Sequence, residues 1–102
     1  MAIGHINMPA LEAFCRRWKV RELALFGSAL RDDFGPESDV DVLATFEADA
    51  DWSLFDHFRM EEELAGLFGR EVDLVTRGGL EASPNHLRRR AILQSARTIY
   101  AA

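Results

Sequence analysis

The stretch that decides the fold covers residues 22–46 and reads ELALFGSALRDDFGPESDVDVLATF. Its first five residues are mostly apolar and end at Gly27-Ser28, which predicts a short strand followed directly by a helix. Its last eight residues, from Asp39 to Phe46, alternate in polarity with a period of two, which predicts a second strand. Between the two strands, Gly35-Pro36 closes the short helix.

The segments on either side of this stretch alternate between helical and strand patterns. Asp51 is the expected N-cap and Gly69 the expected stop of a long helix, and Ile92, Ala96 and Ile99 are expected on one face of the last helix. The alternating order predicts an α/β or α+β domain in which helices cover a small sheet. The expected elements are a helix from Met8 to Lys19, a strand from Glu22 to Phe26, a short helix from Ser28 to Phe34, a strand from Asp39 to Phe46, a helix from Trp52 to Phe68, a strand from Glu71 to Thr76 and a helix opening at Ser83-Pro84.

The length and composition predict one globular domain over residues 1–102. Apolar residues make up 48% of the chain, which argues against intrinsic disorder. No apolar run approaches the roughly 18 residues that a membrane span needs, so we expect a soluble, cytoplasmic protein. Cys15, the single cysteine, excludes an internal disulfide and a cysteine-based zinc site. It lies in an apolar helical pattern, where we expect it to be inert packing.

The charge balance of the chain is acidic. Twelve Lys and Arg residues stand against seventeen Asp and Glu residues, and the formal net charge is -5. A protein that coats nucleic acid non-specifically needs a basic surface to neutralise phosphates. Composition therefore argues against that class of function and against template-directed DNA synthesis.

Gly27 and Ser28 occupy a position suited to binding phosphate. A glycine allows a ligand to approach the backbone closely, and the start of a helix offers unpaired N–H groups and the positive end of a dipole. By itself the pair is a weak signal, because such turns also occur as plain connections.

Three aspartates add a stronger signal. Asp39 and Asp41 are two residues apart on a predicted strand, so their side chains point to the same face and repel one another. A cation between them removes this conflict, and oxygen ligands of this kind suit magnesium or manganese. Asp73 lies in the next strand, from where it reaches the same face if the two strands pair. Three carboxylates facing a phosphate-binding turn indicate a two-metal site for displacement at phosphorus, with Asp73 as general base or metal ligand.

These motifs resemble those of a known family. The segment LFGSALR at residues 25–31, followed by SDVDVL at residues 38–43, is similar to the signature of the DNA polymerase β-like nucleotidyltransferase superfamily. More narrowly, the chain resembles the minimal nucleotidyltransferases, the MNT group of prokaryotes. The resemblance covers nearly the whole chain and includes Asp73 as third acid. The ending LRRRAILQSARTIYAA resembles the closing helix of the family, and a small mixed sheet of the polymerase β-like fold is expected.

The resemblance implies transfer of a nucleoside monophosphate to an acceptor hydroxyl with release of pyrophosphate. Asp39, Asp41 and Asp73 are then the catalytic, metal-binding residues for two Mg²⁺ ions. Gly27, Ser28 and Arg31 are the candidates for nucleotide binding. MNT proteins of this kind are antitoxins that transfer AMP from ATP to a tyrosine of a HEPN-domain toxin. Because the helical substrate-binding domain of larger relatives is absent, we expect a partner to supply the acceptor side.

Several side chains keep two interpretations at this level. Arg31 contacts phosphate or pairs with Asp32 or Asp33, and Ser38 is expected to shape the turn. The arginines at 88–90 lie near the start of the last helix, where the helix dipole disfavours cations. They indicate an anionic neighbour, nucleotide or acidic partner, or a solvated helix face. The histidines lack metal-ligand spacing, and the aromatic residues are expected in the core, with some of them at a partner interface. The histidines are His5, His57 and His86.

Two alternative functions remain open on the sequence alone. The chain is a binding module that neutralises a toxin by occlusion, or it transfers a nucleotide to a small molecule such as an aminoglycoside. The three intact aspartates count against the first alternative. The second requires an acceptor pocket, which a domain of this size builds only by dimerising.

Overall fold

The computed structural model describes residues 6–27 and 39–102 of the chain, so the short helix expected from Ser28 to Phe34 lies outside the described residues. Four strands form one sheet in the order β3-β2-β1-β4. Within the described residues, no helix is long and apolar enough to cross a membrane. The elements are α1 (Met8–Arg17), β1 (Val20–Phe26), β2 (Val40–Phe46), α2 (Leu54–Phe68), β3 (Val72–Thr76), α3 (Arg77–Glu81), α4 (His86–Ser95) and β4 (Arg97–Ala101).

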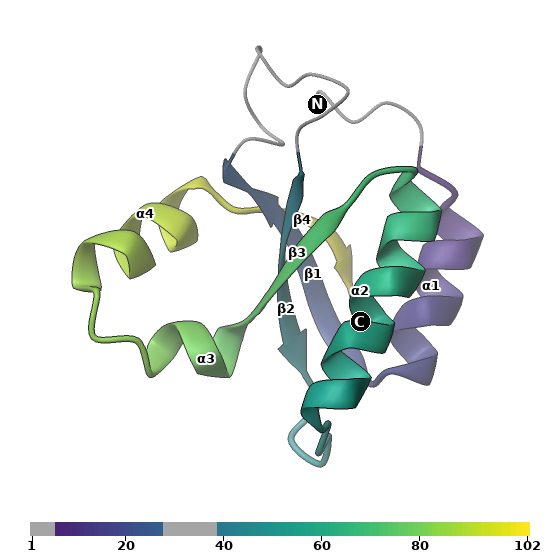
Figure 1. The fold of residues 1–102 in the computed structure, drawn as a ribbon, viewed down its shortest axis with the longest axis horizontal. Coiled ribbons are helices and arrows are strands. Elements are labelled where there is room, and N and C mark those ends of the chain that lie inside the picture. Colours follow the sequence, from purple (N-terminus) through teal and green to yellow (C-terminus); the bar gives the residue numbers. More distant parts are fainter. Residues whose placement is uncertain (1–5, 28–38) are drawn as a thin grey trace.

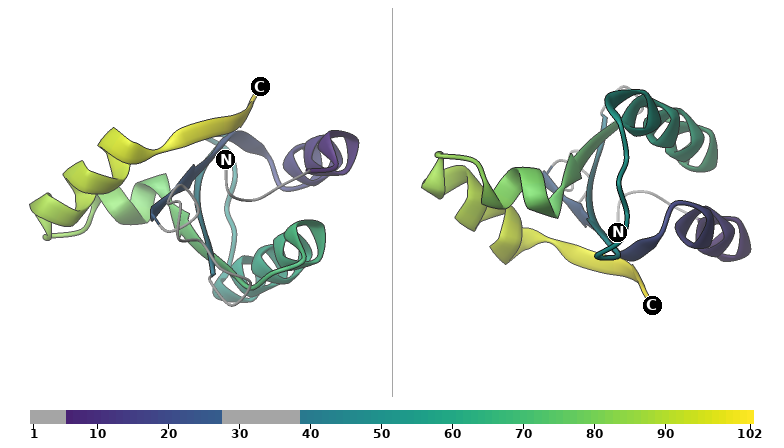
Figure 2. Two further views of the ribbon diagram at one scale, coloured as in Figure 1. Left: turned by 90° about the horizontal axis from the view of Figure 1, so that it is seen from above. Right: turned by 90° about the horizontal axis from the view of Figure 1, so that it is seen from below.

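The sheet is mixed, and the expected architecture is confirmed. β1 pairs antiparallel with β2 and with β4, whereas β2 and β3 are parallel. A parallel pair cannot be joined by a tight turn, and α2 provides the crossover between β2 and β3. Figures 1 and 2 show α1 and α2 side by side on one face of the sheet, with α3 and α4 extending from the other.

The two faces of the sheet contribute to two separate apolar clusters. The larger cluster packs the strand residues Leu23, Leu25 and Val42 against α1 and α2. The smaller one joins Leu43 of β2 to Leu80 of α3 and to other buried residues, namely Ala24, Phe26 and Ile92. Because side chains alternate along a strand, odd-numbered residues of β2 face α3 and α4. This alternation matters for the acids, which are also odd-numbered.

Helices α1 and α2 are tied together by a carboxylate and two tryptophans. Glu63 of α2 accepts a hydrogen bond from the Arg17 guanidinium at 2.6 Å and another from the Trp18 indole N–H. Trp52 packs edge-on against Trp18 with ring centroids 5.1 Å apart, and its own indole N–H donates to the Trp18 carbonyl at 2.9 Å. These contacts hold the second half of α2, and the segment just before it, against the end of α1.

Helix boundaries in α1, α2 and α4 differ from the sequence prediction. α4 begins at His86, with Asn85 as its N-cap, and not at Ser83-Pro84. α1 ends at Arg17, two residues early, because Trp18 leaves the helical conformation and Lys19 adopts a left-handed φ of 56°. α2 begins at Leu54, and its N-cap is Ser53, so Asp51 was the wrong choice. Ser53 forms a capping box with Asp56, which satisfies two backbone N–H groups at once. Gly69, with a φ of 69°, ends α2 as predicted.

The C-terminal prediction was wrong in part. The segment that resembled a closing helix forms α4 only to Ser95 and then enters strand β4, so Ile99 lies on a strand. β4 pairs with the outer edge of β1, which would otherwise expose unsatisfied backbone groups. This requirement prevails over the helical spacing of Ile92, Ala96 and Ile99. The glycine-containing helix α3 was not predicted at all.

Three apolar residues of α2 are not in the core. Phe55 is 83% exposed, and Leu54 and Phe58 are also exposed, whereas Met60 and Leu64 are buried. Residues 60, 64, 67 and 68 share the face that packs on the sheet, and positions 55 and 58 lie on the opposite side of the helix. The expectation that Phe55 and Phe58 pack in the core is therefore wrong.

Cys15 is fully buried in the larger cluster. Burial, together with the negative charge of the nearby Glu12, raises the pKa of its thiol from 9.0 to about 12. The thiol therefore stays protonated in the folded protein while the unfolded chain ionises above pH 9. Below pH 9 the thiol is protonated in both states and leaves the free energy of unfolding independent of pH. Between pH 9 and 12 we expect the ionisation of Cys15 in the unfolded chain to lower the free energy of unfolding. Urea denaturation across this range measures it. A Cys15→Ala variant should lack this part of the decline; an unchanged decline would contradict the assignment.

Candidate active site

Asp41 and Asp73 stand opposite one another at the beginnings of two neighbouring strands. In the parallel ladder between β2 and β3 they are register partners, and neighbouring strands lie about 4.8 Å apart. Asp39 directly precedes β2, and a 2.9 Å hydrogen bond from the Val40 N–H to the Glu71 carbonyl extends the pairing to this point. Alternation along the extended chain places Asp39 on the same side as Asp41. The backbone thus brings the three predicted acids to one corner of the sheet.

The acid corner, defined by Asp39, Asp41 and Asp73, is open to solvent. Asp39 and Asp73 are exposed and Asp41 is half-buried. The carboxylates lie on the same face of the sheet as Leu43, which packs against α3 and α4, and away from the face that α1 and α2 cover. A substrate can therefore reach the carboxylates without opening the larger core.

Gly27 closes the corner from the end of β1. Phe26 is the register partner of Asp41, and Gly27 follows with a left-handed φ of 64°. A Cβ at position 27 would lie 2.5 Å from Oδ2 of Asp41, closer than any side chain allows. Glycine is required here both by the backbone conformation and by the space left beside the carboxylate. Ser28 and Arg31, the other predicted phosphate contacts, lie outside the described residues.

Glu61, which no sequence motif marked, supports β3 from the side. β3 forms one edge of the sheet, and the backbone N–H of Leu74 points outward from the ladder. The Leu74 N–H donates a hydrogen bond of 2.8 Å to the carboxylate of Glu61 on α2. Leu74 directly follows Asp73 in the chain. The contact fixes the strand that carries the third acid. The sequence signal was weak, because Glu61 stands in a run of three glutamates.

The donor set of the acid corner fits magnesium in its chemistry. Within residues 6–27 and 39–102, no three His, Cys, Asp or Glu side chains converge into a group that could hold a metal ion by itself. Magnesium does not need such an assembled cage, since it binds through one or two carboxylates together with water and substrate phosphates. The all-oxygen donors at adjacent strand starts are of this type.

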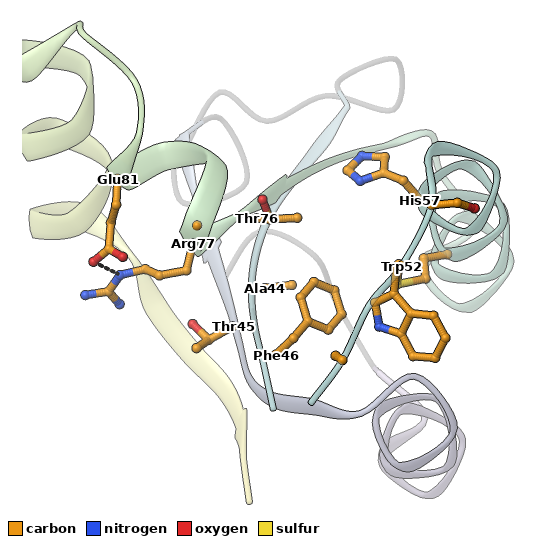
Figure 3. A pocket seen from close by; sticks show the side chains of 12 residues that line it. Ala44, Thr45, Phe46, Trp52, His57, Thr76, Arg77 and Glu81 are labelled. Atoms are coloured by element: carbon orange, nitrogen blue, oxygen red, sulfur yellow. Dashed lines mark hydrogen bonds and ion pairs between the residues drawn. The ribbon is translucent and has the colours of Figure 1, made fainter. Parts of the chain in front are cut away.

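A cavity of about 400 Å³ opens at the other end of the same strands. Figure 3 shows its wall, with the rings of Phe46 and Trp52 on one side and the Arg77–Glu81 ion pair on the other. Its nearest lining residue on β2 is Ala44, three residues and about 10 Å along the strand from Asp41. The cavity is thus separate from the acid corner.

The arginines of α4 divide into two groups. Arg89 turns towards α3, where it donates to the Glu81 carbonyl at 3.2 Å and lies 2.7 Å from Nδ1 of His86. Arg88 and Arg90 are exposed, and neither forms an ion pair with the described residues. Arg89 thus has a structural role that neither interpretation of the triplet included, and the choice between an anionic neighbour and a solvated face concerns Arg88 and Arg90.

The arrangement of the acid corner and Gly27 agrees with the family that the chain matches in sequence. Residues 8–99 match the family described as nucleotidyltransferase domain. The chain belongs to this family. It is 41% identical over 66 residues to the protein adenylyltransferase MntA of Thermococcus cleftensis, a match that covers 65% of each chain. The matched segment thus spans just under two thirds of the length of that curated relative.

Solved structures show the same fold. A toxin–antitoxin structure with AMP-PNP superposes with a TM-score of 0.70 at 20% identity, covering 95% of this chain and 75% of the other. A structure of a tri-AMPylated Shewanella oneidensis HEPN toxin in complex with its MNT antitoxin gives a TM-score of 0.60 at 18% identity, covering 94% and 71%. The minimal nucleotidyltransferase fold predicted from the sequence is confirmed.

Two glycines of this nucleotidyltransferase domain allow the close approach at Gly27 to be tested. Gly27 and Gly69 have almost the same left-handed φ, but a Cβ at Gly69 meets no atom within 4 Å. Gly69→Ala should lower the free energy of unfolding by about 1 kcal/mol, the usual cost of a left-handed alanine. Gly27→Ala should cost more, because the new methyl group also displaces the Asp41 carboxylate. Urea denaturation of both variants measures the difference, and equal losses would contradict the contact.

Proposed function

We propose that this chain is a protein adenylyltransferase that moves AMP from ATP to a tyrosine hydroxyl of a partner HEPN toxin, releases pyrophosphate and thereby acts as an antitoxin. The observation that carries the proposal is the Asp41–Asp73 register pair beside Gly27, on an open face of a nucleotidyltransferase fold. The named activity of the Thermococcus cleftensis relative supports the choice of AMP and of a protein acceptor.

The reaction requires an acceptor oxygen, a leaving group and a place for one proton. The tyrosine oxygen forms a bond to the α-phosphorus of ATP while the bond from that phosphorus to the bridging oxygen of pyrophosphate breaks. Asp73 accepts the hydroxyl proton, since it is exposed and stands at the rim of the acid corner. Asp39 and Asp41 would hold magnesium, which when bound neutralises charge on the triphosphate. Gly27 lets the phosphates approach the backbone, and Ser28 and Arg31 are the further phosphate contacts that the sequence motif predicts.

The first test is transfer of label from ATP. Purified protein is incubated with magnesium, α-labelled ATP and its HEPN toxin, beside an Asp39→Asn, Asp41→Asn double variant. We expect the variant to lose at least about a hundredfold in rate, the usual effect of removing groups that act on the reacting phosphate. The matched control is Asp49→Asn, Asp51→Asn, which has the same spacing but lies in the loop beyond the other end of β2. It should retain its rate within about twofold.

The outcomes separate the alternatives. Label on the toxin from both double variants would overturn the assignment of the acid corner. No label from the native chain, together with full neutralisation of the toxin by the Asp39→Asn, Asp41→Asn variant, would replace transfer by occlusion. Label that enters RNA added to the same reaction, and not the toxin, would identify RNA as the acceptor.

Asp73 has a different role from the other two acids, and a separate variant tests it. Asp73→Asn keeps the shape and exposure of the side chain but removes its basicity. We expect kcat to fall about a hundredfold or more while the KM for ATP changes little, because nucleotide binding rests on Asp39, Asp41 and Gly27. Steady-state kinetics with labelled ATP measures both parameters. A rise in the KM for ATP with normal kcat would instead make Asp73 a binding residue.

A further inference from the structure

Helix α4 contributes little to the core of the protein. Of its ten residues only Ile92 is buried, in the smaller cluster with Phe26 and Leu43. The side chain of Leu87 is 81% exposed and therefore takes no part in the core. Figures 1 and 2 show α4 extending away from the sheet with α3. A helix held to the sheet by Ile92 and to α3 by Arg89 leaves most of its surface available for another molecule.

The exposed surface of α4 combines apolar and cationic groups. Leu87, Arg90, Ala91 and Gln94 recur at the spacing of one helical face, and this face is opposite Ile92. Asn85 caps the first turn, with its side chain accepting from the Arg88 N–H at 3.0 Å. Arg90, which forms no ion pair with the described residues, adds a positive charge to this surface.

The charge of the chain is divided unevenly along the sequence. Residues 82–102 contain four arginines and no acidic residue, whereas residues 1–81 contain eight basic and seventeen acidic residues. The acid-free, arginine-containing segment thus includes α4, the helix whose Ile92 packs on the face that bears the acid corner. A partner that approaches this face meets α4 as well as Asp41 and Asp73.

We propose that the outward face of α4, formed by Leu87, Arg90, Ala91 and Gln94, is the docking surface for an acidic, partly apolar region of the acceptor protein. This inference rests on the proposed function, because it explains how the acceptor hydroxyl is held at the acid corner. Complementary charge favours an acidic partner, and the exposed Leu87 favours a protein surface over the phosphates of the nucleotide.

Two matched double variants test the surface. Leu87→Asp, Arg90→Glu reverses the character of α4, and acids near a helix start do not weaken the helix. Leu54→Asp, Arg59→Glu makes the same changes on exposed positions of α2, on the opposite face of the sheet. Circular dichroism establishes that both variants are folded. Binding of the HEPN toxin is then measured by calorimetry without ATP, and transfer kinetics are measured separately.

The α4 variant should weaken toxin binding at least tenfold and raise the KM for the toxin similarly, with kcat and the KM for ATP unchanged. The α2 variant should match the native protein within twofold. Higher salt should weaken native binding more than binding by the α4 variant. Unchanged toxin binding by the α4 variant, a rise confined to the KM for ATP, or a larger loss in the α2 variant would each overturn the proposal.

The same measurements separate this proposal from the proposed function. Toxin that binds through α4 but receives no AMP would overturn adenylyl transfer and leave the docking surface in place. Transfer at a normal KM for the toxin by the α4 variant would overturn the docking surface and leave the enzyme assignment intact. A native chain that neither binds nor labels the toxin would overturn both.

Discussion

The parallel pairing of β2 with β3 is the contact on which the candidate site depends. It sets Asp41 opposite Asp73, and a shift by one residue would send one of the two carboxylates to the other face of the sheet. The crossover through α2 makes this pairing possible, and the hydrogen bond from the Leu74 N–H to Glu61 closes the outer edge of β3. Gly27 then completes the corner, because only a residue without a side chain fits beside Asp41.

The two faces of the sheet have different physical roles. On one face, α1 and α2 bury most of the large apolar side chains, and the Glu63 contacts hold the two helices together. On the other face, a small cluster anchors α3 and α4 and leaves the acid corner exposed. The face covered by α1 and α2 thus supplies most of the buried apolar surface. The opposite face can therefore carry mutually repelling carboxylates and the sparsely buried, cationic helix α4. This division explains how so small a domain keeps an open site.

Most of the sheet was predictable because its signals are local. Period-two alternation identified β2, and Gly27 and Gly69 marked ends of elements where a left-handed backbone is needed. The differences arose where a local pattern has two solutions. The aromatic residues at 55 and 58 recur at helical spacing, yet the face of α2 that packs is the one carrying Met60 and Leu64. Ser53 displaced Asp51 as the cap because it forms a reciprocal pair with Asp56.

By itself the sequence predicted the nature of the chemistry, because the spacing of Asp39 and Asp41 and the glycine turn before them restrict what a strand can present. It also determined the order of the described helices and strands from α1 to β3, but it gave no sign of α3. Only the tertiary structure decided that residues 97–101 form β4, since the need to cover the β1 edge does not exist until the sheet is assembled. In the same way, the alignment of Asp73 with Asp41, the support from Glu61 and the exposure of α4 depend on contacts between distant segments, which no local pattern encodes.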